Sequence, residues 1–134
     1  MNLPKPSLMN TLHKVLATVV ALLMIATSGN AMATPSDQEA RHIEALIQRV
    51  ATMKGITFIR NGTEAKADGA AKHLRDKYAY FRTEIGSAED FIRLCGTKSE
   101  FSGRAYTVRL PDGTLRPSAE LLVGELRKFR MGSP

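Results

Sequence analysis

Apolar residues recur every three or four positions in four stretches of the chain, a spacing typical of helices with one buried face. The clearest stretch runs from Ala67 to Ile85, with Asp68 as the candidate N-cap if Ala67 lies just outside the helix. An earlier one starts at Ser36, whose Ser-Asp-Gln-Glu sequence is a capping box. The pattern predicts helices over roughly 36–54, 67–85, 87–95 and 118–130. Val123 is placed on the inner face of the last helix.

Apolar and polar residues alternate over 105–110, which predicts a strand with one buried face. Pro-Asp-Gly at 111–113 then predicts a turn and a short return strand over 114–116. Another apolar run, at 56–59, is too brief for a helix, and at Asn61-Gly62 the chain is expected to reverse into the second helix. The predicted fold class is therefore mainly α, within the α+β class: four helices with a small β-hairpin before the last.

The first 33 residues have the pattern of a secretory signal peptide. Lys5 and Lys14 give a positive start, 15–26 is apolar, and Ala31-Met32-Ala33 offers a small-x-small cleavage site. A run of 12 residues is too short for a bilayer core, which needs about 20. We expect a signal peptide over 1–33, a single small globular domain over 34–134, a periplasmic or secreted location, and no stable membrane insertion after cleavage.

Without residues 1–33 the chain has 17 basic and 13 acidic residues, a mild positive excess. Charges of both signs alternate and aromatic residues are few, which argues against nucleic-acid binding. Cys95 is the one cysteine, so no disulfide can form within the chain and packing must hold the fold. Its place on the inner face of the third helix predicts a buried, inert thiol.

Two groups of polar residues are candidates for a binding site. His73 and Lys77 are neighbours on one flank of the second helix, and Arg60 and Asn61 lie at the turn before it. These side chains could receive an anionic group such as a carboxylate or phosphate. The alternative is that they are solvated side chains bordering the core.

The other group lies in the segment that enters the predicted strand and consists of Ser99, Ser102, Arg104 and Tyr106. A serine there could act as a nucleophile, but neither Gly-x-Ser-x-Gly nor Ser-x-x-Lys occurs. Serines in such positions are more often caps and turn formers.

Histidine and cysteine spacing gives no sign of a metal site. Outside the signal peptide only His42 and His73 remain, and neither belongs to a metal-binding pair. His42 is expected to be a solvated surface residue. The sequence predicts neither a metal nor a cofactor.

Several motifs together resemble a known family. Phe-Ile-Arg-Asn-Gly at 58–62 is followed by Ala-Ala-x-His-Leu at 70–74, Glu-Asp-Phe-Ile at 89–92 and Ser-Glu-Phe-Ser-Gly-Arg-Ala-Tyr at 99–106. Over roughly residues 40–127 the chain resembles the small secreted bacterial proteins classified as domain of unknown function 5329. The resemblance implies export and a single domain. It also makes Arg60, Asn61, Gly62, His73, Lys77, Ser99, Ser102, Gly103 and Tyr106 motif positions, without supplying an activity or a cofactor.

Three functions remain open at this point. The first is a non-catalytic binding or accessory protein of the cell envelope, whose partner would be an envelope protein or a polar small molecule. The second is a small hydrolase or transferase with His73 as general base and Ser102 as nucleophile. Glu84 lies about 16 Å along the helix from His73, so the orienting acid would be Glu39, Glu44 or Glu89. The third is a purely structural interaction module.

Overall fold

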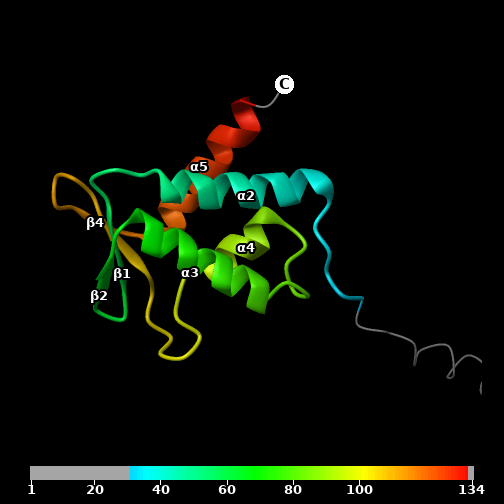
Figure 1. The fold of residues 1–134 in the computed structure, drawn as a ribbon, viewed down its shortest axis with the longest axis horizontal. Helices are drawn as coiled ribbons and strands as arrows, with labels where there is room; N and C mark the ends of the chain where they lie inside the picture. The colour runs from blue at the N-terminus through cyan, green and yellow to red at the C-terminus, as the bar shows by residue number, and fades with distance from the viewer. Residues whose placement is uncertain (1–30, 133–134) are drawn as a thin grey trace, which may run out of the picture. The chain divides into compact units, whose positions relative to one another are not determined.

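A computed structural model describes residues 31–132, which form four helices and a four-stranded antiparallel sheet (Figure 1). All but the last three residues of the expected signal peptide lie outside the described residues. The elements are α2 (Asp37–Ala51), β1 (Thr57–Arg60), β2 (Thr63–Ala65), α3 (Ala67–Tyr80), α4 (Ala88–Cys95), β3 (Thr107–Arg109), β4 (Leu115–Pro117) and α5 (Ser118–Gly132). The predicted α+β class and the four helices are confirmed.

Two helices, α2 and α4, begin at the serines whose side chains cap them. Ser36 accepts a hydrogen bond from the Glu39 amide at 3.3 Å, and Ser87 caps α4 in the same way. At α3 the expected cap is wrong: Lys66 occupies the N-cap position, and Asp68 lies inside the first turn. A carboxylate in the first turn still favours the helix, because it faces the positive end of the helix dipole.

α3 is shorter than its apolar periodicity suggests, because the helix ends at Tyr80 rather than near Ile85. Phe81 and Ile85 are nevertheless buried, from a turn in which the Glu84 amide donates to the Phe81 carbonyl at 2.8 Å. Apolar residues that enter the core from a turn can thus continue a helical pattern beyond the helix.

The sheet is larger than the single hairpin expected from the sequence. Its strand order is β2-β1-β3-β4, and every pair is antiparallel. The apolar run at 56–59 supplies β1, and the Asn61-Gly62 turn leads into β2 before the second helix begins. Both turn residues have positive φ, 50° and 77°, as a two-residue hairpin turn requires. The predicted hairpin of β3 and β4 is present and forms the other half.

The core lies between the helices. Ile43, Leu46, Ile47 and Val50 of α2 and Ala88, Phe91, Ile92 and Cys95 of α4 are buried, as their spacing predicts. On α5, Leu122 and Leu126 are buried but Val123 is 42% exposed, so its placement on the inner face is wrong. His42 is also buried rather than solvated, with its Nδ1 3.3 Å from a Glu39 carboxylate oxygen.

Two groups of charged residues connect helices at the edge of this core. The Glu125 carboxylate of α5 accepts from Arg49 Nε of α2 at 2.9 Å and from Lys128 Nζ at 2.8 Å. The Glu39 carboxylate of α2 accepts from the Ala88 amide at the start of α4 at 2.7 Å. The ends of the helices are therefore held to one another by charge-assisted hydrogen bonds.

No helix among the described residues has the length and apolar character needed to cross a bilayer.

Candidate functional site

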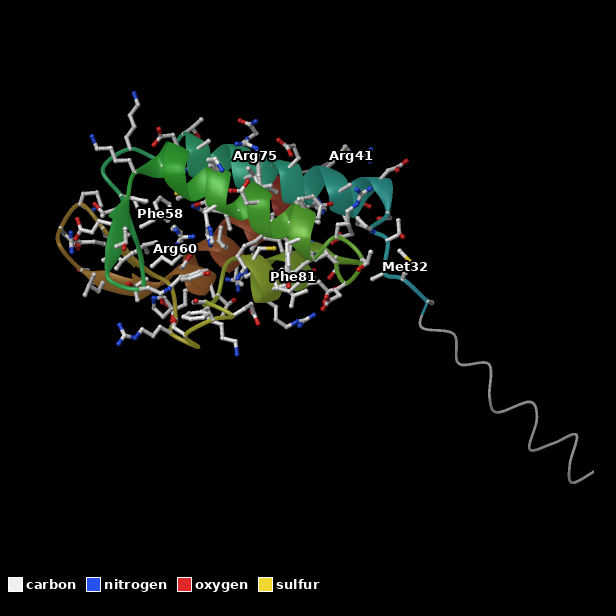
Figure 2. All side chains as sticks on the ribbon, turned by 60° about the horizontal axis from the view of Figure 1, so that its bottom comes forward. Met32, Arg41, Phe58, Arg60, Arg75 and Phe81 are labelled. Atoms are coloured by element: carbon white, nitrogen blue, oxygen red, sulfur yellow. The ribbon has the colours of Figure 1, made fainter. Side chains whose placement is uncertain are left out.

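Arg60, His73, Lys77 and Tyr106 meet where the sheet adjoins α3. Arg60 is the last residue of β1, His73 and Lys77 lie one turn apart on α3, and Tyr106 directly precedes β3. Phe58 and Arg60 are two residues apart and so share one face of β1. Figure 2 shows both on the side that α3 covers. We call these four residues the cationic cluster.

Short polar contacts join the four residues of the cationic cluster. Arg60 Nη1 contacts His73 Nδ1 and lies 3.3 Å from His73 Nε2. Nε2 also lies 3.2 Å from the Tyr106 hydroxyl. Lys77 Nζ donates to the same hydroxyl at 3.4 Å and to the Lys98 carbonyl at 3.0 Å. The Tyr106 hydroxyl thus contacts both His73 and Lys77.

Burial and neighbouring charge keep His73 neutral. Burial, followed by the positive charges of Arg60 and Lys77, lowers the pKa of His73 to about 4. Burial also lowers the pKa of Lys77 and raises the pKa of Tyr106. At neutral pH the cluster therefore holds two cations, a neutral imidazole and a phenol, which is an arrangement of donors suited to an anion.

A small apolar pocket opens beside the cationic cluster, with a volume of about 70 Å³. Its walls include Phe58, Ala70, Leu74 and Leu122, and its polar side consists of Arg60, His73, Tyr106 and threonines of the sheet. Sequence reasoning missed the pocket, because it assigned these apolar side chains to the core. The one sequence signal is the pair of small residues Gly69-Ala70, which leaves the space between α3 and the sheet open.

Asn61, Ser99 and Ser102 form a second, adjoining group. Asn61 Nδ2 donates to Ser99 Oγ at 3.3 Å, and Ser102 Oγ donates to Asn61 Oδ1 at 2.5 Å. The backbone amides of Ser102 and Arg104 donate to the two serine hydroxyls. These contacts join the β1–β2 turn to the 99–104 loop, which is a turn-forming role. The Arg104 side chain is exposed.

The catalytic alternative finds little support in this geometry. Within residues 31–132 the hydrogen-bond partners of His73 are Arg60 and Tyr106, and neither is a carboxylate. Glu39 and Glu89 contact Arg130 instead. Ser102 donates to an amide oxygen rather than to a base. A pKa of about 4 also makes His73 a poor general base near neutral pH.

The 99–104 loop also carries an exposed aromatic residue that the sequence analysis did not select. Phe101 is 100% exposed, and the loop around it is held by hydrogen bonds from Gly103 to Ser99 at 2.8 Å and from Ser99 to Arg104 at 3.0 Å. A single exposed hydrophobic side chain is common on protein surfaces, so the position of Phe101 by itself does not identify an interaction site.

No group of three or more potential metal ligands gathers within the part of the chain that the structure describes.

The fold and the cationic cluster define a small α+β domain with a donor-rich site beside an apolar pocket. The chain matches the model described as "Family of unknown function (DUF5329)" over residues 37–130, and it belongs to this family. It is similar to the uncharacterized protein YfeK of Salmonella typhimurium strain LT2, with 34% identity over 95 residues, which cover 71% of this chain and 77% of that protein. No solved structure matches it.

Proposed function

We propose that this chain is an exported, non-catalytic binding or accessory protein of the cell envelope, which recognises a polar or anionic ligand or partner at the cationic cluster. The observation that carries the proposal is the contact of a half-buried His73 with Arg60 on one side, beside Lys77 and Tyr106. The contact with His73 uses Nη1 of Arg60, and the other N–H groups of the guanidinium form no hydrogen bond with the described residues. Export rests on the signal-peptide pattern of residues 1–33.

Binding accounts for the cluster better than catalysis does. A site for an anion needs fixed donors, and Arg60, Lys77 and Tyr106 supply them from three parts of the fold. Acyl or group transfer would need a nucleophile next to a base. Ser102 and His73 belong to separate hydrogen-bond groups instead.

The test is titration of the purified, ¹⁵N-labelled protein with acetate and with inorganic phosphate, followed by NMR. We expect saturable shifts at Arg60, His73 and Tyr106 with at least one of the two anions. The Arg60/His73/Lys77 triple alanine variant should lose them, whereas a control triple alanine variant at the exposed residues Lys54, Arg75 and Arg82 should keep them. Equal binding by the two variants, or no saturable binding by the wild type, would contradict the proposal.

A second candidate function is an interaction module that holds a protein partner through Phe101. The full exposure of this side chain on a hydrogen-bonded loop favours it. The test is affinity capture from the native envelope with Phe101→Ser beside the Arg60/His73/Lys77 triple variant. A partner lost with Phe101→Ser alone would support the module, and one lost only with the triple variant would support the cationic cluster.

A further inference from the structure

We infer that the ligand group recognised at the cationic cluster is a carboxylate attached to a small aliphatic group of about three carbons or fewer. This inference rests on the proposed function and specifies its ligand class. The carboxylate would lie against Arg60, and the aliphatic group would enter the adjoining pocket.

The size and lining of the pocket set the limit on the aliphatic group. The volume of about 70 Å³ is roughly half that of the ~150 Å³ cavity known to hold benzene. The walls made by Phe58, Leu74 and Leu122 offer no hydrogen bonds to a polar group. A methyl, ethyl or isopropyl group therefore fits, whereas a phenyl ring or a sugar does not.

The donors beside the pocket favour a carboxylate as the anion. Arg60 lines the pocket and is exposed on its outer side, so its planar guanidinium can meet two carboxylate oxygens at once. The Tyr106 hydroxyl, which lines the pocket, is an additional polar group that can donate a hydrogen bond. Phosphate could use the same donors, but it would leave the apolar walls unfilled.

The charge of Glu100 acts on Lys77 and Tyr106, but no ion pair among the described residues joins a carboxylate to Arg60. Asp76, one helical turn from Lys72, accepts from Lys72 Nζ at 2.6 Å. Glu64 accepts from Arg109 Nη2 at 2.6 Å on the far side of β1 from the helix. Arg60 therefore contacts a neutral imidazole rather than a carboxylate of the described residues. Its guanidinium can then bind a carboxylate that comes from another molecule.

Two sources would present this chemistry: a free short-chain acid, or the C-terminal carboxylate of a peptide that ends in alanine or a residue of similar size. The exposure of Arg60 and Thr63 at the mouth leaves room for a chain to continue outward. A free acid and a peptide terminus would make the same carboxylate contact with Arg60. The ligands tested must therefore include one compound of each kind.

The experiment measures dissociation constants of the purified protein for propionate, propionamide, benzoate and inorganic phosphate by NMR titration. Propionate should bind at least about tenfold more tightly than propionamide, because only the carboxylate forms charge-assisted hydrogen bonds with Arg60. Benzoate should bind no better than phosphate. N-acetylalanine and its C-terminal amide form the second arm: tighter binding of N-acetylalanine than of propionate indicates a chain terminus, and the reverse indicates a free acid.

Two variants test the two parts of the site, each with a control on α3. Arg60→Gln should weaken propionate binding at least about tenfold, and the exposed Arg75→Gln should leave it unchanged. Ala70→Leu should fill the pocket and remove propionate binding while the protein remains folded, whereas the exposed Ala79→Leu should have no effect. Thermal unfolding checks that each variant is folded.

The outcomes separate this inference from the proposed function. Phosphate binding at the cluster without propionate binding would overturn the inference and leave the proposed function standing. Equal affinities for propionate and propionamide, or propionate binding unaffected by Ala70→Leu, would also overturn it. Saturable binding of none of the anions would overturn both.

Discussion

His73 shows how a single residue takes its role from its surroundings. An isolated histidine titrates near neutral pH, but burial and the charges of Arg60 and Lys77 bring its pKa to about 4. A neutral imidazole can lie against the Arg60 guanidinium, whereas the charge of a protonated ring would be repelled by it.

This shift predicts a measurable pH dependence of stability. Between pH 6.5 and about 4 the unfolded chain takes up a proton at His73 and the folded protein does not, so the free energy of unfolding should fall as the pH falls. After solvent screening at this half-exposed site, we expect a loss on the order of 1 kcal/mol. In the His73→Asn variant, the free energy of unfolding measured with urea should depend less on pH between pH 6.5 and 5. The same pH dependence in the variant and the wild type would contradict the lowered pKa of His73.

The carboxyl groups of Glu39 and Glu89 provide an internal control for this experiment, because they titrate at lower pH than the range in which His73 affects stability. Hydrogen bonds from the Ala88 amide and from Arg130 lower the pKa of Glu39 and Glu89 respectively below the ordinary 4.5. Their contribution to stability is present above pH 4.5 and is lost as the pH falls through the folded-state pKa values. Wild type and His73→Asn should therefore lose stability in parallel below about pH 4.

Cys95 is expected to be inert in the folded protein. Its side chain is fully buried, and burial raises the pKa of the thiol to about 12, so thiolate is scarce at neutral pH. We predict that iodoacetamide labels the protein only in denaturant, as measured by mass spectrometry at matched pH. Rapid labelling without denaturant would show that α4 opens or that the thiol is accessible.

At the scale of elements, the β1–β2 turn and the contact between α5 and α2 position the cationic cluster and the pocket beside it. The β1–β2 turn places Arg60 beside α3, and its Asn61 holds the 99–104 loop through both serines. The contact of Glu125 with Arg49 holds α5 against α2, and Leu122 of α5 forms a wall of the pocket. The pocket therefore depends on elements that are distant in sequence.

Asn61 contributes both its positive φ and its amide hydrogen bonds, and two variants separate these effects. Asn61→Gly keeps the backbone conformation but removes the contacts with Ser99 and Ser102, and we expect a loss of about 1 kcal/mol. Asn61→Ala adds the cost of a left-handed backbone, for a total of about 2–3 kcal/mol. Chemical unfolding measures both losses. Equal losses would mean that the backbone conformation is not strained.

The buried Glu125 should contribute to stability through its two cations. Burial alone would raise the pKa of this carboxyl, but the hydrogen bonds from Lys128 and Arg49 outweigh burial and lower it. Glu125→Gln keeps the shape and removes the charge, and we expect a loss of about 1–3 kcal/mol in urea unfolding at pH 7. The exposed Glu120→Gln on the same helix is the matched control and should change stability by less than about 0.5 kcal/mol.

At the scale of the whole molecule, this member of the DUF5329 family is held together without a disulfide within the chain. Cys95 is the one cysteine in the chain, so the fold depends on its apolar core and on the charged contacts between helix ends. The site lies where β1 and β2 meet α3.

Export is the prediction that belongs to this scale. Expression in the native host should yield a protein that begins at Thr34, because the signal-peptide pattern ends at Ala33. Mass spectrometry of the periplasmic or secreted fraction measures this, with a cytoplasmic marker as the fractionation control. Recovery of the full chain with its original N-terminus from the cytoplasm would contradict it.

Helices were predictable because their signals are local. The capping serines and the period of 3.6 residues reflect contacts within one or two turns, so Ser36 and Ser87 mark their helices correctly. The end of α3 was not predictable, because a turn can continue the apolar pattern of a helix. The exposure of Val123 was not predictable either, because neighbouring elements determine which residues of an apolar helix face are buried. The first hairpin was missed because β1 and β2 are too short to show alternation, and because β1 is stabilised by pairing with β3, which is distant in sequence.

The sequence alone determined the class of fold, the family and which polar residues were worth considering, since composition, spacing and motifs are properties of the chain itself. Only the tertiary structure decided that Arg60, His73 and Tyr106 touch, that His73 is neutral, and that a small apolar pocket adjoins them. The physical reason is that hydrogen bonds, desolvation and cavities arise between segments far apart in the chain, here β1, α3 and the residues before β3.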